Sequence, residues 1–279
     1  MDGHRSSQRP GSCTLTDENI HTDLVLSPFD ATSDEMLAAA KVADRGHFRG
    51  VWTFDHFSGA VAGASWSRDP FVTLGAIAAV TTRIRLGVLV ANIANRSPAQ
   101  LASALNTLQG LAPERVVAGL GAGAGPNSRF AVEQVAIGRQ PLPATERRQA
   151  LSDYVESLKG VWTPTLEAPV TSAVVDFENN QVPPIVIGAN GPKTIRLAAH
   201  IADGVNIRAG ASLPERVELA LATAQSGNFE VSVFDRLDLN HHLGGDIEEL
   251  RSLGVTARTL VINAPYDLAK LQDIADRLV

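Results

Sequence analysis

The chain has 279 residues, of which 44% are hydrophobic and 19% charged, and its formal net charge at pH 7 is −6. This composition is ordinary for a globular protein, and the length fits one α/β barrel with a large core. The negative net charge argues against binding to nucleic acid or to an anionic membrane surface, and no apolar run reaches the roughly 20 residues that a membrane-spanning helix needs.

Residues 1–22 are polar and lack the apolar core of a signal peptide, so we expect a disordered leader and a cytoplasmic protein. The single cysteine, Cys13, lies in this leader, which excludes an internal disulfide framework and a cysteine-based zinc site. Residues 23–279 are expected to form one domain.

Apolar runs and amphipathic segments alternate along this domain. Strands are predicted at residues 23–29, 50–55, 85–91, 115–123, 184–189, 204–210, 229–234 and 258–263. A helix is predicted after each strand; four of these helices open at Ser33-Asp34, Asp69-Pro70, Ser97-Pro98 and Pro192, and another spans residues 145–162. The segment 166–182 is poorly patterned and is predicted to be a short insertion, a hairpin outside the main fold, before the fifth strand.

Eight strand–helix units in about 250 residues predict a (β/α)₈ TIM barrel, an α/β fold. The strands are uniformly apolar, as expected for a parallel sheet that is buried on both faces. A doubly wound open sheet is the alternative, and eight parallel strands in one chain make it less favourable. In a barrel of this kind, catalytic groups lie at the carboxyl ends of the strands.

Asp55 and His56 end the second predicted strand in "GVWTFDHF". Histidine can move a proton near neutral pH because its unperturbed pKa lies there. A solvated loop pair, or a buried histidine with its hydrogen bonds satisfied, would give the same pattern, and the residues alone leave both interpretations open.

Several stretches together resemble the bacterial luciferase-like family of flavin- and deazaflavin-dependent oxidoreductases. They are "VWTFDHF", "DPFVTLGAIAAVTTRIRLGVLVA", "RSPAQLA", "RVVAGLGAG", "PPIVIGANGPKTIRLAAHIADGVN" and "TLVINAP". The resemblance implies a (β/α)₈ fold, FMN or coenzyme F420 as cofactor, and a non-proline cis peptide within residues 89–92. It also implies that His56 is the catalytic acid or base and that Asp55 holds the cofactor or orients the imidazole.

The cofactor-binding residues implied by the resemblance come from three strand ends. They are Asp55, Leu89, Val90, Ala91, Asn92, Gly121, Ala122, Gly123, Gly188, Ala189, Asn190, Gly191 and Lys193. The last group begins a helix with proline in its first position, where free N–H groups suit a phosphate. An ordinary buried strand, a flexible glycine-rich loop and a well-capped turn are the structural alternatives for the three groups.

Two departures argue against a deazaflavin-dependent sugar dehydrogenase. Such enzymes carry a glutamate where this chain has Ala124, and a tryptophan soon after the histidine, where it has Ser58, Gly59 and Ala60. His241 and His242 are adjacent and complete no metal site. Trp66 is a candidate for lining the substrate cleft.

The predicted function is that of an F420-dependent oxidoreductase that transfers hydride to or from a small organic substrate, with His56 moving the proton. An FMN-dependent monooxygenase that uses O₂ and a partner reductase is the first alternative, and a non-catalytic flavin-binding barrel is the second. A homodimer is expected, and a flavin or F420 reductase could supply reduced cofactor. The sequence specifies neither the substrate nor the direction of the reaction.

Overall fold

A computed structural model describes residues 20–162, 182–239 and 247–278. Cys13, the predicted insertion up to residue 181, and the pair His241 and His242 lie outside these ranges. No helix within the described ranges combines the length and apolar character required to cross a membrane.

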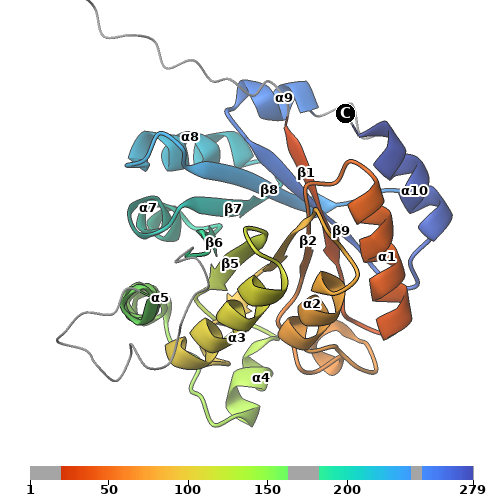
Figure 1. The fold of residues 1–279 in the computed structure, drawn as a ribbon. Coiled ribbons are helices and arrows are strands. Elements are labelled where there is room, and N and C mark those ends of the chain that lie inside the picture. The colour runs from red at the N-terminus through yellow and green to blue at the C-terminus, as the bar shows by residue number, and fades with distance from the viewer. Residues whose placement is uncertain (1–19, 163–181, 240–246, 279) are drawn as a thin grey trace, which may run out of the picture.

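Parallel strands close into a barrel at the centre of the molecule (Figure 1). The strands are β1 (His21–Leu26), β2 (Gly50–Thr53), β3 (Arg85–Val88), β4 (Ala91–Asn92), β5 (Val116–Gly121), β6 (Ile185–Gly188), β7 (Gly204–Arg208), β8 (Glu230–Arg236) and β9 (Ala257–Ile262). Their order is β3-β2-β1-β9-β8-β7-β6-β5-β4, and β3 also pairs with β5. Because β3 and β4 both pair with β5 and are separated only by Leu89 and Val90, they form one barrel strand. The barrel therefore has eight strands, as predicted.

Helices surround the barrel (Figure 1). They are α1 (Ser33–Arg45), α2 (Pro70–Ala78), α3 (Pro98–Leu111), α4 (Ala131–Ala136), α5 (Ala144–Trp162), α7 (Pro192–Ile201), α8 (Leu213–Thr223), α9 (Ile247–Ser252) and α10 (Leu268–Arg277), with one 3₁₀ turn, η1 (Ala60–Ala62). Contacts run between neighbours around the ring, from α10 to α1, α2, α3, α5, α7 and α8. These seven helices thus pack side by side around the barrel and bury residues against the strands and their flanking helices.

The helix starts follow from capping chemistry. Asp69 and Ser97 accept backbone N–H bonds in the first turns of α2 and α3, and a proline occupies the first position of each, as predicted. In α1 the cap is Thr32, which forms a reciprocal capping box with Glu35. The predicted cap, Ser33, is instead the first helical residue, because the threonine one position earlier satisfies the free N–H of Glu35.

Two features differ from the predicted elements. β1 starts at His21, two residues before the predicted start, because His21 and Thr22 already pair with Ala257 and Arg258. The helix α4 lies between β5 and the predicted helix at residues 145–162, where no further helix was predicted, since six residues are too few for a helical period to stand out.

The indole ring of Trp52 is the largest side chain in the apolar cluster inside the barrel. Trp52, which is 3% exposed, packs with Val25, Val117 and other apolar side chains inside the barrel. A Cβ at Gly87 would lie 2.5 Å from the indole of Trp52, and a Cβ at Gly119 would lie 1.9 Å from the carbonyl oxygen of Val88. Glycine is required at both positions because the ring and the interrupted third strand leave no room for a side chain.

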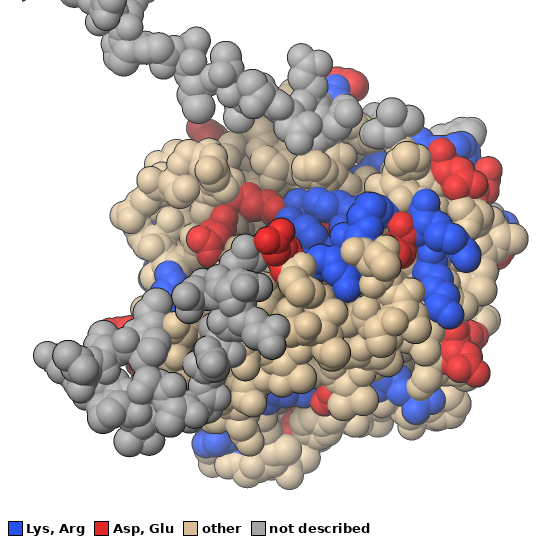
Figure 2. Space-filling view, in the orientation of Figure 1, with Lys and Arg blue, Asp and Glu red and all other residues tan. Residues whose placement is uncertain are grey.

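The amino ends of the strands carry a buried ion cluster. Arg49 donates to both carboxylate oxygens of Asp23, a residue without exposed surface, and lies 2.8 Å from Glu230, which also accepts from Arg85 at 3.3 Å. Burial alone would lower the pKa of Arg49, but the carboxylates of Asp23 and Glu230 raise it above its ordinary value. On the face of the molecule seen in Figure 2, basic side chains likewise gather with acidic side chains beside and between them.

Candidate active site

A cavity of about 1480 Å³ opens at the carboxyl ends of the strands. It is lined by residues at the ends of β4 and β8 and by residues at or just after the ends of β1, β2, β5, β6, β7 and β9, together with residues of α4 and the first turn of α5. Of the residues predicted to form the site, Asp55, His56, Leu89, Val90, Asn92, Gly121, Ala122, Gly123, Gly188, Ala189, Asn190 and Gly191 line it, whereas Ala91 and Lys193 do not. Ala91 is buried in β4, and Lys193 is exposed on α7, where Thr194 faces the cavity instead.

Val90 forms the floor of the cavity. The Leu89–Val90 peptide bond is cis and lies within the four residues predicted to contain such a bond. A Cβ at Gly121 would lie 2.4 Å from one methyl group of Val90, and a Cβ at Gly188 would lie 2.9 Å from the other. The two glycines that end β5 and β6 therefore leave space for the Val90 side chain, in addition to opening the backbone to a ligand.

His56 lies at one side of this floor and is held by a glutamate. Its Nδ1 atom lies 2.5 Å from Oε2 of Glu133 on α4. The other oxygen, Oε1, accepts the backbone N–H groups of Phe57 and Ser58, each at 2.9 Å. Glu133 is 3% exposed, so its carboxylate is compensated by these three partners rather than by water. The His56 side chain is 22% exposed toward the cavity.

Aromatic rings surround the imidazole. Phe130 lies 4.8 Å and Phe29 5.4 Å from the His56 ring, measured between ring centroids. Phe54 continues this row from Phe29 to Phe234, with centroid distances of 6.4 and 6.1 Å. The row makes an apolar wall that runs from His56 across to the side of the cavity that carries Arg208, and such a wall favours an organic substrate over a strongly hydrated one.

Asp55 faces away from the imidazole of His56. One of its oxygens accepts from Arg96 at 2.6 Å and the other accepts the backbone N–H of Asn92 at 2.9 Å. Burial alone would lower the pKa of Arg96, but Asp55 and Asp69 raise it. Asp55 therefore ties the end of β2 to β4, and the orientation of the imidazole, one of its two expected roles, falls to Glu133.

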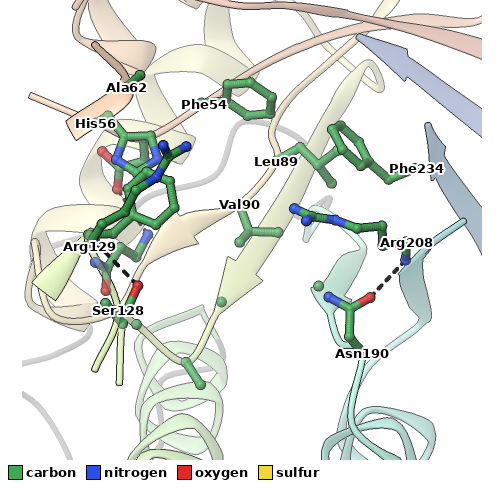
Figure 3. Close-up of a pocket in the computed structure, with 18 of the residues that line it drawn as sticks. Phe54, His56, Ala62, Leu89, Val90, Ser128, Arg129, Asn190, Arg208 and Phe234 are labelled. Atoms are coloured by element: carbon green, nitrogen blue, oxygen red, sulfur yellow. Dashed lines mark hydrogen bonds between the residues drawn. The ribbon is translucent and has the colours of Figure 1, made fainter. Parts of the chain in front are cut away.

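The opposite side of the cavity is basic. Figure 3 shows Asn190 and Arg208 on one side of Val90 and His56 with Arg129 on the other. The side-chain oxygen of Asn190 accepts the backbone N–H of Arg208 at 2.8 Å, and the guanidinium group of Arg208 lies over the Phe234 ring. Asn190 and Gly191 immediately precede the first turn of α7, so the positive end of that helix and Arg208 face the same part of the cavity.

The cavity has an excess of positive charge. Its arginines are Arg129, Arg147, Arg148, Arg208 and Arg236. Four carboxylates also line it, Asp30, Asp55, Glu133 and Asp235, so the formal excess is one positive charge. Within the described ranges none of the five arginines forms an ion pair with a carboxylate, whereas Asp55 contacts Arg96 and Glu133 contacts His56. A cavity with this charge in a chain of net charge −6 attracts an anionic ligand.

Two contributions to the site were not predicted from the sequence. Glu133 and Gln134 on α4 are each 3% exposed, while Val132 and Val135 are 59% and 60% exposed. The polar face of α4 is thus buried, whereas most amphipathic helices bury their apolar face. A prediction from hydrophobic patterning therefore places Glu133 and Gln134 in solvent. Arg208 carried a weaker signal, because it ends a strand at the face where barrel sites lie. Trp66 does not line the cavity; its indole N–H donates to the carbonyl oxygen of Ala31.

Comparison with known proteins identifies similar sequences. A family model described as luciferase-like monooxygenase matches residues 11–230. The 5,10-methylenetetrahydromethanopterin reductase of Methanolobus tindarius is 31% identical over 193 residues, which are 67% of this chain and 53% of the reductase. The chain thus spans about half the length of the curated relatives it matches. Several of these relatives have names that include F420, such as an F420-dependent glucose-6-phosphate dehydrogenase and an F420-dependent hydroxymycolic acid dehydrogenase.

Solved structures share the fold over nearly the whole chain. An F420-dependent secondary alcohol dehydrogenase in complex with an F420–acetone adduct superposes with a TM-score of 0.75 at 16% identity, covering 93% of this chain and 98% of that one. The oxygenating constituent of 3,6-diketocamphane monooxygenase from Pseudomonas putida, in complex with FMN, gives 0.67 at 14% identity and covers 93% and 98% of the two chains. At these identities the two structures establish the barrel fold.

Proposed function

Since this chain belongs to the luciferase-like monooxygenase family, we propose that it is an oxidoreductase that binds coenzyme F420 at the carboxyl end of its barrel. F420 supplies a ring that accepts or delivers hydride. The protein binds a small organic substrate beside that ring, and His56 donates or accepts the substrate proton. The names of several F420-dependent relatives support this choice of cofactor.

The cavity fits such a cofactor in shape and in charge. Val90 provides a flat apolar floor because Gly121 and Gly188 carry no side chains that would displace it. On the basic side, Asn190, Gly191 and the first turn of α7 bind the phosphate, and Arg208 contributes a charge. The bound cofactor therefore lies between this anion-binding side and the wall that carries His56.

The chemistry depends on His56. Its Nδ1 contacts Glu133, and no described residue forms a hydrogen bond with its Nε2, so Nε2 is the nitrogen that meets the substrate oxygen. Phe29, Phe54 and Phe130 exclude water from this region and orient the apolar part of the substrate. The single observation that carries the proposal is the placement of His56 opposite the Asn190–Arg208 side, with Val90 between them (Figure 3).

An FMN-dependent monooxygenase is the second candidate, favoured by the description of the family and by the fold of the FMN-bound neighbour. The phosphate side of the cavity serves FMN equally well, because both cofactors carry a phosphate. In that case a partner reductase supplies reduced FMN, and O₂ is consumed. The homodimer, the cytoplasmic location and the reductase partner stay predictions.

Fluorescence titration of the purified protein with F420 and with FMN distinguishes these functions. We expect saturable binding of F420, tighter than that of FMN. The substitution Arg208→Gln should weaken F420 binding about tenfold, the scale of one charge-assisted hydrogen bond. Arg196→Gln is the matched control, because Arg196 is exposed on α7 and does not line the cavity.

Tighter binding of FMN together with product-coupled O₂ consumption would replace the F420 proposal by the monooxygenase. Binding of either cofactor without turnover of any alcohol or carbonyl compound in a broad panel would favour the non-catalytic binder. If Arg208→Gln and Arg196→Gln change the affinity for F420 equally, Arg208 does not contact the phosphate of the cofactor.

A further inference from the structure

The contact between His56 and Glu133 joins two segments that are 77 residues apart in the chain. Both are at the cavity, yet the carboxylate of Glu133 is 3% exposed and the imidazole is 22% exposed. The carboxylate therefore lies behind the ring, and only the ring presents an edge to a ligand. A buried carboxylate is costly unless each oxygen has a partner, and here the oxygens are satisfied by His56, Phe57 and Ser58.

This contact specifies the tautomer of His56. An ionised carboxylate can only accept hydrogen bonds, so the 2.5 Å contact requires a proton on Nδ1. The neutral imidazole then has a lone pair on Nε2, the nitrogen on the cavity side. In this form His56 can accept a substrate proton at Nε2, and after accepting it the ring can donate it back.

We propose that Glu133 is a positioning residue that holds His56 with its proton on Nδ1, so that Nε2 exchanges protons with the substrate. This inference rests on the proposed role of His56 in proton transfer. Glu133 presents almost no surface to a substrate, because its side chain is 3% exposed, whereas the imidazole beside it is 22% exposed. It acts through His56 alone.

The groups that face the imidazole support this assignment. Phe29 and Phe130 pack on it and offer no hydrogen bond in its plane. Arg129 lies on the same side of the cavity (Figure 3), and its guanidinium group stacks over the Phe130 ring, 4.8 Å from the ring centroid. Glu133 is therefore the one acidic group among the described residues in contact with the ring, and the tautomer depends on it.

Glu133 also fixes the loop that carries His56. Its Oε1 accepts from Phe57 and Ser58, the two residues that follow the histidine. One carboxylate therefore determines both the position of the backbone and the rotation of the ring. Ala124, at the position where some deazaflavin-dependent sugar dehydrogenases carry a glutamate, carries no acid, and Glu133 comes nine residues later in the chain.

The variant Glu133→Gln tests the proposal with minimal change of shape. Glutamine keeps Oε1 as acceptor for Phe57 and Ser58 but places an amide donor opposite Nδ1 of His56. The proton must then move to Nε2, which leaves the neutral ring unable to accept a proton from the cavity. We expect ¹⁵N NMR of histidine-labelled, cofactor-free protein to show His56 protonated on Nδ1 in the wild type and on Nε2 in the variant.

Turnover by the F420-loaded variant should fall by up to the roughly 10²–10⁴-fold that a general acid–base group contributes, with the Kd for F420 unchanged. Glu215→Gln, an exposed carboxylate on α8, is the matched control and should leave both the tautomer and turnover as in the wild type. A wild-type His56 protonated on Nε2, or the same tautomer in wild type and variant, would overturn the proposal.

The NMR measurement needs neither cofactor nor substrate, so it decides the role of Glu133 independently of the proposed function. If the tautomers differ as expected but no cofactor binds, the proposed function fails and the positioning role stands. If the protein turns over substrate with F420 but the wild type and the variant have the same tautomer, the proposed function stands and the positioning role of Glu133 fails.

Discussion

The two ends of the barrel both carry charged side chains but arrange them in opposite ways. At the amino ends of the strands, Asp23, Arg49, Arg85 and Glu230 contact one another and are largely buried. At the carboxyl ends, Arg208 and four other arginines face a cavity without a carboxylate partner in the described part of the chain. At the amino ends the charges are paired within the protein, whereas at the carboxyl ends these five arginines remain accessible to an anionic ligand.

This difference separates stability from function. A charge that is paired and buried strongly destabilises the fold when its partner is removed, whereas a charge that faces a cavity can be removed at little cost to stability. Substitutions at the two ends should therefore change different measured quantities. The following predictions test that separation, beginning with the largest expected effect.

Replacing His56 should abolish most of the activity. We expect His56→Ala to lower turnover of the best alcohol or carbonyl substrate by roughly 10²–10⁴-fold, because the proton-transfer group is lost, while F420 still binds. Steady-state kinetics and a cofactor titration measure the two effects. His47→Ala provides the control, because His47 is an exposed histidine at the other end of the barrel. Unchanged turnover in His56→Ala would remove the catalytic assignment.

Replacing Arg49 should destabilise the fold. Arg49→Met leaves the carboxylate of Asp23 buried without its cation, and we expect a loss of about 3–5 kcal/mol in the free energy of unfolding. Denaturant unfolding followed by tryptophan fluorescence measures this loss. The exposed Arg45, in the last turn of α1, provides the control substitution Arg45→Met. Measured without denaturant and at a temperature well below the unfolding transition, the Kd for F420 should not change. A large change in this Kd would contradict the separation of stability and ligand binding between the two ends.

The smallest expected effect concerns the floor of the cavity. In Gly121→Ala the new methyl group meets the Val90 side chain, so we expect a loss of about 1–3 kcal/mol in stability and weaker F420 binding. The second substitution Val90→Ala should recover part of both losses. A double-mutant cycle over the two positions measures this coupling. Additive effects would show that Val90 does not occupy the space left by Gly121.

The barrel could be predicted from the sequence because its signals are local and repeated. Each strand is a short apolar run bounded by turn residues, and caps such as Asp69-Pro70 and Ser97-Pro98 mark the helices that follow. The third strand was predicted to be continuous from residue 85 to 91, and the cis peptide that separates β3 from β4 was expected only from the resemblance to a family. No local pattern in "RLGVLVAN" distinguishes it from a continuous strand.

The site was predictable where it lies at the end of a strand and not where it lies on a loop. His56, Asn92 and Asn190 follow apolar strands, so their place at the mouth of the barrel comes from the topology. Glu133 belongs to a six-residue helix that exposes Val132 and Val135 and buries Glu133 and Gln134. The distance between Glu133 and His56 depends on how a long loop folds, and the spacing of 77 residues contains no information about it.

The helix α4 connects two loops through adjacent side chains. Glu133 accepts hydrogen bonds from the loop after β2, while Gln134 accepts the backbone N–H of Ala124 in the loop after β5. Grafting a different segment in place of residues 128–137 would consequently alter proton handling and the cofactor-facing backbone in a single step. Engineers who wish to retune this barrel for new substrates should exchange that stretch as one cassette, or leave it intact and vary the wall formed by Phe29 and Phe54.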